Sequence, residues 1–216
     1  MLINIDHYKL LKDVLTKKQV TLVAVSKIQS IEKIKALYDL GERNFGENYV
    51  QELCTKEQEL QDSGINWHFI GHLQCNKVKY IAPFIHLIQS VDSLKLLKEI
   101  NKEAKKNNRI INCLLQVYIA KEDTKYGLDE NELAEILNFK ELGNLENIEI
   151  KGLMGMASFV DDENIVKSEF NYLQSIFNQN PQFEILSMGM SGDYELAISC
   201  GSNMVRIGSS IFGARK

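Results

Sequence analysis

Proline and linker-like sequence are nearly absent from this 216-residue chain. It holds only two prolines, Pro83 and Pro181, and no Ser/Gly-rich or low-complexity segment, so nothing in it predicts a boundary between domains. A chain of this length can bury most of its apolar surface around one core and is too short for two full-sized enzyme domains. We therefore expect a single domain over residues 1–216.

Cysteine is also scarce, and its spacing excludes two classes of protein. The four cysteines lie far apart and form no C-x-x-C pair: Cys54, Cys75, Cys113 and Cys200. This spacing argues against a zinc site and against a disulfide scaffold. We expect reduced thiols, most of them packing residues, in a cytoplasmic protein.

Long apolar runs and an excess of positive charge are both missing. No run approaches the ~18 residues that span a bilayer. Residues 1–15 break their apolar positions with Asp6, His7 and Lys9, which predicts a short amphipathic helix in place of a signal peptide. The 25 Lys and Arg residues face 29 Asp and Glu, a net charge of −4. We therefore expect neither a membrane nor nucleic acid as a partner.

A metal site is not indicated either. His68 and His72 are four residues apart, a spacing that can pair ligands on a helix, but they lie in a strand-like segment and no Glu follows the first His. We expect no metal. His68 is instead predicted to lie in or under a binding site, and a buried core histidine is the alternative.

The order of the chain is an alternation of two periodicities. Eight short β-rich runs fall at 21–27, 43–48, 67–71, 85–91, 111–119, 148–156, 183–190 and 203–210, with amphipathic stretches between them. Ser93 and Asp129 are predicted to cap two of these helices. Eight units in 216 residues leave 27 residues per unit, which is compact for a (β/α)₈ barrel but allowed. We expect this α/β barrel with an N-terminal helix, and a doubly wound open sheet is the alternative.

In a (β/α)₈ barrel, the loops after the strands form one open face where the chemistry takes place. Polar or small residues follow five of the predicted strands: Lys27; Glu47 and Asn48; Gly71, His72 and Gln74; Ser191; Gly208, Ser209 and Ser210. The sequence therefore predicts that these residues meet at one rim.

Lys27 is the most reactive group in this set. An amine in a dry mouth is disfavoured as a cation, which lowers its pKa and makes the nitrogen a nucleophile for a carbonyl group. The simpler interpretation is a lysine whose stem packs at the strand end while its charge reaches solvent. Lys27 alone does not decide between them.

The second indication is an anion site at the other side of the same mouth. Barrels often bind phosphate with the loops after strands seven and eight, where this chain places Ser191, Gly192, Gly208 and Ser209. Ser191 as a helix N-cap, with the glycines forming turns, is the structural alternative and is compatible with the site. A phosphate site opposite a nucleophilic lysine matches pyridoxal 5′-phosphate.

Six blocks of the sequence resemble the pyridoxal phosphate homeostasis protein family, which shares the barrel of alanine racemases. They are AVSK, FGENYVQE, WHFIGHLQCNK, KGLMGM, SMGMSGDYELAI and GSNMVRIGSSIFGAR, and they run in order from Thr21 to Arg215. The resemblance implies a cofactor held as an aldimine on Lys27 and phosphate contacts from Ser191, Gly208 and Ser209. It also implies Arg206 facing the pyridine nitrogen and Asn48 at the mouth.

Three details depart from the family pattern. Cys75 and Gly192 replace more usual residues, and the segment after the sixth strand is short, which predicts a reduced loop over the mouth. Gly192 leaves the side-chain detail near the phosphate open but keeps the backbone donors.

Arg206 and the length of the chain favour a carrier over an enzyme. An arginine is donor-only and cannot keep the pyridinium protonated, so it supports carbanion chemistry weakly. Racemisation also needs an acid or base on each face of the substrate carbon, and the chain has no length for the second domain that supplies one in alanine racemases. We expect a monomeric protein without a complete catalytic apparatus that holds pyridoxal phosphate and delivers it to apo forms of dependent enzymes.

Two enzymatic alternatives remain. A weak racemase or deaminase using the same cofactor would need a group across the ring, for which Tyr49, Cys54 and Cys75 are the candidates. A lysine-dependent aldolase acting on a sugar phosphate would need no cofactor, and the absorption of a bound pyridoxal distinguishes the two.

Overall fold

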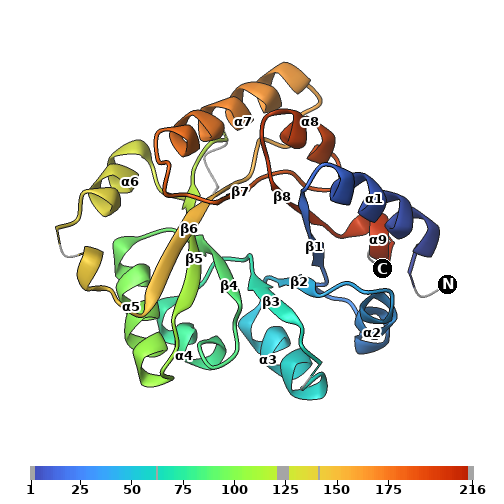
Figure 1. The fold of residues 1–216 in the computed structure, drawn as a ribbon, viewed down its shortest axis with the longest axis horizontal. Helices are drawn as coiled ribbons and strands as arrows, with labels where there is room; N and C mark the ends of the chain where they lie inside the picture. Colours follow the sequence, from blue (N-terminus) through green and yellow to red (C-terminus); the bar gives the residue numbers. More distant parts are fainter. Residues whose placement is uncertain (1–2, 62, 121–126, 141, 214–216) are drawn as a thin grey trace.

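The computed structural model describes residues 3–61, 63–120, 127–140 and 142–213 of the chain. Parallel strands form a closed barrel in chain order, β1 to β8 (Figure 1). They are β1 (Thr21–Val25), β2 (Asn44–Glu47), β3 (Asn66–Phe69), β4 (Leu87–Val91), β5 (Ile111–Val117), β6 (Ile148–Gly155), β7 (Ile185–Ser187) and β8 (Met204–Ile207). Each overlaps one of the eight predicted runs, and β3 begins one residue before its run.

The last strand pairs with the first, which closes the sheet. The register between β1 and β8 runs from Thr21 opposite Met204 to Ala24 opposite Ile207, with all pairing parallel. This closure confirms the (β/α)₈ barrel and excludes the open, doubly wound sheet.

Helices surround the barrel on its outside (Figure 1). They are α1 (Ile5–Lys17), α2 (Ile31–Asp39), α3 (Val50–Glu59), α4 (Val78–Ile81), α5 (Leu94–Lys106), α6 (Glu130–Leu137), α7 (Glu163–Asn178), α8 (Tyr194–Ser199) and α9 (Ser209–Phe212), with 3₁₀ turns η1 (Cys75–Lys77) and η2 (Leu142–Asn144). The two predicted caps are confirmed. Ser93 accepts from the Leu96 N–H at 3.2 Å, and Asp129 forms a reciprocal capping box with Glu132.

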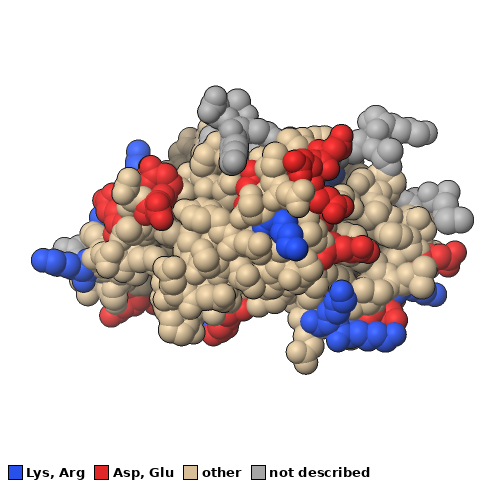
Figure 2. All heavy atoms as spheres, turned by 90° about the horizontal axis from the view of Figure 1, so that it is seen from above, with Lys and Arg blue, Asp and Glu red and all other residues tan. Residues whose placement is uncertain are grey.

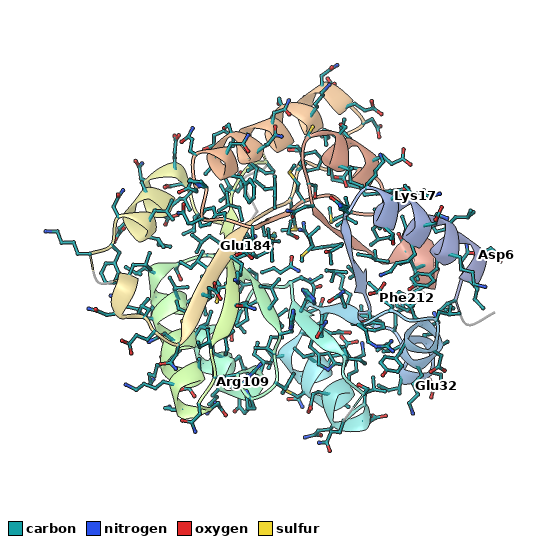
Figure 3. The ribbon with its side chains drawn as sticks, in the orientation of Figure 1. Asp6, Lys17, Glu32, Arg109, Glu184 and Phe212 are labelled. Atoms are coloured by element: carbon teal, nitrogen blue, oxygen red, sulfur yellow. The ribbon has the colours of Figure 1, made fainter. Side chains whose placement is uncertain are left out.

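The main hydrophobic core lies between the strands and the helices. Helix α7 illustrates the amphipathic pattern. Its apolar residues Val166, Phe170 and Leu173 lie on one face, and all three are buried against this core. A smaller apolar cluster of Val23, Leu87, Leu114, Met154 and Met204 fills part of the barrel interior. Figure 3 shows side chains occupying the space inside the ring of strands, so the barrel is packed and is not a pore.

The predicted N-terminal helix is present as α1, and it packs beside α9. Asn4 caps α1 and its backbone N–H donates to Ile211 O at 2.8 Å. On the other side of α9, Lys33 Nζ donates to Phe212 O at 3.1 Å, and Figure 3 labels Phe212 between α1 and α2. The elements that precede β1 and follow β8 are thus joined.

Two surface properties bear on partners. Within the described ranges, no helix combines the length and the apolar character that crossing a bilayer would take. On the face seen in Figure 2, acidic and basic side chains are interspersed and the basic ones form no continuous stripe.

Candidate functional site

A cavity of about 540 Å³ opens at the C-terminal ends of the strands. Its lining brings together six of the seven cofactor-binding residues predicted from the sequence: Lys27, Asn48, Ser191, Arg206, Gly208 and Ser209. They come from the ends of β1, β2, β7 and β8. The seventh, His68, is not part of the lining.

Lys27 lies in a tight turn just after β1. Leu22, Val23 and Ala24 are fully buried, so the strand itself is anchored in the core. Lys27 follows two residues after the strand, is half-buried and lines the cavity. The next residue, Ile28, has a φ of 63°, a left-handed conformation that a β-branched residue rarely adopts. Contacts with the surrounding residues must therefore hold the turn that carries Lys27 in this conformation.

The loops after β7 and β8 meet on the other side of the cavity. The Gly208 N–H donates to Ser191 Oγ at 3.3 Å. A Cβ on Gly208 would lie 3.0 Å from the Val25 carbonyl oxygen, so glycine lets this loop lie against the end of β1. Ser191 is not an N-cap, contrary to the structural alternative considered above, because α8 begins at Tyr194 and Asp193 occupies the cap position. Gly192 faces open space.

Asn48 is held at the mouth by a close approach of two backbones. A Cβ on Gly71 would overlap the Asn48 carbonyl group, so only glycine lets the end of β3 pass this close to the end of β2. The Asn48 Oδ1 atom is buried and accepts no hydrogen bond from any residue that the structure describes. An unpaired acceptor in a cavity wall is costly unless a ligand supplies a donor.

Arg206 is a buried cation at the base of the cavity. Its Nη1 donates to Ser187 O at 2.8 Å and to Ser187 Oγ at 2.7 Å, and its Nη2 donates to Gly155 O at 2.8 Å. Burial lowers the pKa of Arg206 to about 10, and the nearby carboxylate of Asp193 opposes that shift. The guanidinium therefore remains charged at neutral pH and offers donors only.

His68 lies inside the barrel, connected to the site through other side chains. Gln89 Nε2 donates to His68 Nδ1 at 3.0 Å, and the opposite ring nitrogen lies 3.2 Å from Asn44 Oδ1. Burial lowers the pKa of His68 to about 3, with the neighbouring His86 adding to the shift. The ring is therefore neutral, and its place in the barrel is that of a core residue beneath the cavity.

Part of the cavity wall was not among the residues predicted from the sequence. The segment after β6 contributes Ser158, Phe159, Val160 and Asp161, while the reduced loop over the mouth stays a prediction. The loop is tied to α7, because Glu169 accepts from both the Ser158 N–H at 2.7 Å and the Ser158 hydroxyl at 2.6 Å. Asp193 was also missed. The signal was available, since these residues follow β6 and β7 and every strand end faces the mouth.

The remaining candidates lie outside this cavity. Tyr49, Cys54, His72 and Gln74 line a neighbouring cleft of about 730 Å³ between α3 and α4. Cys75 packs against the core. His72 Nδ1 lies 3.1 Å from Asp92 Oδ2, and within the described residues no cluster of three His, Cys, Asp or Glu side chains could hold a metal.

Comparison with known proteins decides the family. The family described as alanine racemase, N-terminal domain, matches residues 5–216. The pyridoxal phosphate homeostasis protein of Pasteurella multocida is 39% identical over 204 residues, which cover 91% of this chain and 87% of the relative. The chain belongs to the pyridoxal phosphate homeostasis protein family.

Solved structures extend the comparison of this homeostasis-family chain. PipY of Synechococcus elongatus PCC7942, solved with PLP bound, is 34% identical with a TM-score of 0.82, covering 90% of this chain and 93% of that one. An alanine racemase from Bartonella henselae with covalently bound pyridoxal phosphate has a TM-score of 0.69 at 17% identity, covering 95% of this chain and 58% of that one. The racemase likeness concerns the fold alone.

Proposed function

We propose that this protein binds pyridoxal 5′-phosphate in the cavity and takes part in its homeostasis by holding and delivering it. Lys27 is the covalent attachment point, and Ser191, Gly208 and Ser209 bind the phosphate. The observation that carries the proposal is the meeting of Lys27, Arg206 and the Ser191–Gly208 loops in one cavity. The name shared by the relatives and the PLP-bound PipY support it.

The residues present fit this cofactor. The loops after β7 and β8 offer a serine hydroxyl and backbone N–H groups that suit a phosphate. The unpaired Asn48 Oδ1 needs a donor, which the ring hydroxyl of the cofactor can provide. When bound, pyridoxal phosphate would supply an aldehyde group, and Lys27 is the residue whose amine would hold it.

Arg206 favours a protein that holds the cofactor over an enzyme that uses the cofactor to convert a substrate. It is charged, donor-only and fixed by Ser187 and Gly155. Such a group cannot keep a proton on the pyridine nitrogen, so the ring is a weak electron sink. Because attachment of an aldehyde to a lysine amine is reversible, Lys27 would hold the cofactor in a form that could be released to another amine at the mouth.

The partners follow from this role. Apo forms of pyridoxal phosphate-dependent enzymes are the proposed recipients, and the protein is proposed to act as a cytoplasmic monomer. The four cysteines are all free thiols, which is typical of proteins from a reducing compartment. Light scattering of the purified protein tests the oligomeric state.

The experiment that tests the proposed function compares the protein with Lys27→Ala. Each is incubated with pyridoxal phosphate, desalted, measured by absorption, reduced with borohydride and analysed by peptide mass mapping. We expect a near-visible band only in the parent and a reduced adduct on Lys27. The matched control is Lys95→Ala, which removes an exposed lysine of α5 and is expected to behave as the parent.

Two results would contradict the proposal. One is the absence of a band in the parent, which would favour the cofactor-free aldolase. The other is a reduced adduct on a different lysine. Racemisation of amino acids by the loaded protein at an enzymatic rate would show that the delivery role is incomplete.

A further inference from the structure

Behind the Lys27 turn lies a cluster of three charged residues, two of them buried and one partly exposed, that does not line the cavity. Lys56, on α3, is 4% exposed. Its Nζ lies 2.8 Å from Oε1 of Glu47, the fully buried last residue of β2, and 2.6 Å from Oε1 of Glu52 one turn earlier on α3. Within the described residues, the cavity lining includes none of these three.

This cluster holds the residues on both sides of Lys27. Before the lysine, the Ser26 hydroxyl donates to Glu47 Oε1 at 2.6 Å and the Ser26 carbonyl accepts from Lys56 Nζ at 2.7 Å. After it, the Ile28 N–H donates to Glu52 Oε1 at 2.6 Å. The two neighbours of Lys27, Ser26 and Ile28, thus make three hydrogen bonds to one cluster.

These hydrogen bonds explain how the Lys27 turn keeps its conformation. Ile28 has a φ of 63°, which persists only where the surroundings impose it. The Ile28 N–H bond to Glu52 and the Lys56 bond to Ser26 fix the peptides on either side of Lys27. The direction in which the Lys27 side chain leaves the backbone is set between them.

A cluster of this kind is not explained by stability alone. Removing the Glu47 carboxylate and the Lys56 ammonium group from water is costly, and apolar residues of the same volume often stabilise a fold as well or better. Burial raises the pKa of the Glu47 carboxyl, with Lys56 opposing the shift, and Glu47 Oε2 has no hydrogen-bond partner among the described residues. Such an arrangement is expected where charged groups hold a neighbouring segment of backbone, here the Lys27 turn, in one conformation.

We propose that Lys56, Glu47 and Glu52 are positioning residues that hold Lys27 in the orientation needed to attach the cofactor. They act through the backbone at Ser26 and Ile28 and do not contact the ligand. This inference rests on the proposed function, because it assigns a role relative to Lys27. It also distinguishes the two lysines, since the buried Lys56 amine donates to three acceptors while the half-buried Lys27 lines the cavity.

The test separates binding from attachment. Pyridoxamine 5′-phosphate, which has an amine in place of the aldehyde, measures the phosphate and ring contacts by equilibrium dialysis. Pyridoxal phosphate followed by timed borohydride trapping and mass mapping measures the rate of attachment to Lys27. In Lys56→Met and Glu52→Ala we expect unchanged pyridoxamine phosphate affinity and attachment slowed about tenfold or more, because the nitrogen is no longer oriented.

Two further variants make the test specific. Glu52→Gln keeps an oxygen that can accept from the Ile28 N–H and is expected to recover part of the rate lost in Glu52→Ala. Lys12→Met is the matched control, since it breaks another ion pair to a buried carboxylate, from the partly exposed Lys12 Nζ to Glu42 Oε2 at 2.8 Å, before the start of β2 and so at the opposite end of the barrel. We expect Lys12→Met to attach the cofactor at the parent rate.

The outcomes distinguish this inference from the proposed function. No adduct on Lys27 of the parent protein overturns both. An adduct in the parent that forms equally fast in Lys56→Met and Glu52→Ala overturns the positioning role alone. The positioning role is also overturned if folded Lys56→Met and Glu52→Ala lose pyridoxamine phosphate binding as strongly as they lose attachment. The same holds if Lys12→Met attaches the cofactor as slowly as these two variants. Glu52 is partly exposed, so Glu52→Ala keeps the test valid if Lys56→Met does not fold.

Discussion

Arg206 Nη1 donates to the Ser187 hydroxyl oxygen at 2.7 Å inside the barrel. That hydroxyl donates in turn to Gln89 Oε1 at 2.7 Å, and Gln89 Nε2 donates to His68 Nδ1 at 3.0 Å. The other ring nitrogen of His68 reaches Asn44 Oδ1 at 3.2 Å. A continuous hydrogen-bond network therefore joins the cavity to the start of β2, and such networks couple the orientation of their members.

Replacing Ser187 with alanine tests this network. The change removes one acceptor of Arg206 and the donor to Gln89, both buried, and we expect the free energy of unfolding to fall by about 1–3 kcal/mol. Because Arg206 lines the cavity, the affinity for pyridoxal phosphate should fall as well. Urea unfolding and equilibrium dialysis measure the two effects.

The control for Ser187 is Ser175→Ala on α7. Its hydroxyl donates to Tyr172 O within the helix at an exposed position, so the change is expected to stay within about 0.5 kcal/mol. Equal unfolding free energies for Ser187→Ala and the parent would show that the network carries no stability.

The stability of the protein should fall at acidic pH because of His68. Burial lowers the pKa of His68 to about 3 from the ordinary value of 6.5. Above pH 6.5 the ring is neutral in the folded and in the unfolded protein, so His68 does not reduce the free energy of unfolding. As the pH falls from 6.5 towards 3, the unfolded chain binds a proton that the folded protein does not, and the free energy of unfolding falls. We expect this residue to remove about 2 kcal/mol between pH 7.5 and pH 5.

Urea unfolding of the parent and of His68→Gln over that pH range measures the effect. Glutamine can accept from Gln89 and donate to Asn44 but does not titrate, so its curve should be flatter. His86, whose ring centroid lies 5.4 Å from that of His68 and whose pKa is also lowered by burial, leaves a residual slope. Parallel curves for the two proteins would rule out His68 as the cause.

Gly71→Ala should damage the mouth of the cavity. The added Cβ would overlap the backbone of Asn48, so the ends of β2 and β3 must separate, at a cost of about 1–3 kcal/mol. Asn48 would be displaced from the cavity wall and cofactor affinity would fall. Thermal unfolding and dialysis test this, with Gly143→Ala as the control because a Cβ there meets nothing within 4 Å. Equal effects of the two substitutions would contradict the steric explanation.

Much of the site could be predicted because the fold makes strand ends converge. Lys27, Asn48, Ser191 and Gly208 come from strands far apart in the sequence, yet all line one cavity. Periodicity located the strands, and the geometry of a parallel barrel sends their C-terminal ends to one face. The same rule could have found the segment after β6, which was instead judged by its length.

The alternation of strands and helices, the caps at Ser93 and Asp129, and the family could all be predicted from the sequence, because they depend on local patterns and ordered motifs. Which polar residues form the cavity wall and which support it from behind became clear from the three-dimensional fold. Lys56 lies nine residues from Glu47 and thirty from Ser26, and no pattern along the chain indicates that they touch. His68 shows the same limit, since the orientation of a side chain and its partners in the core depend on three-dimensional packing.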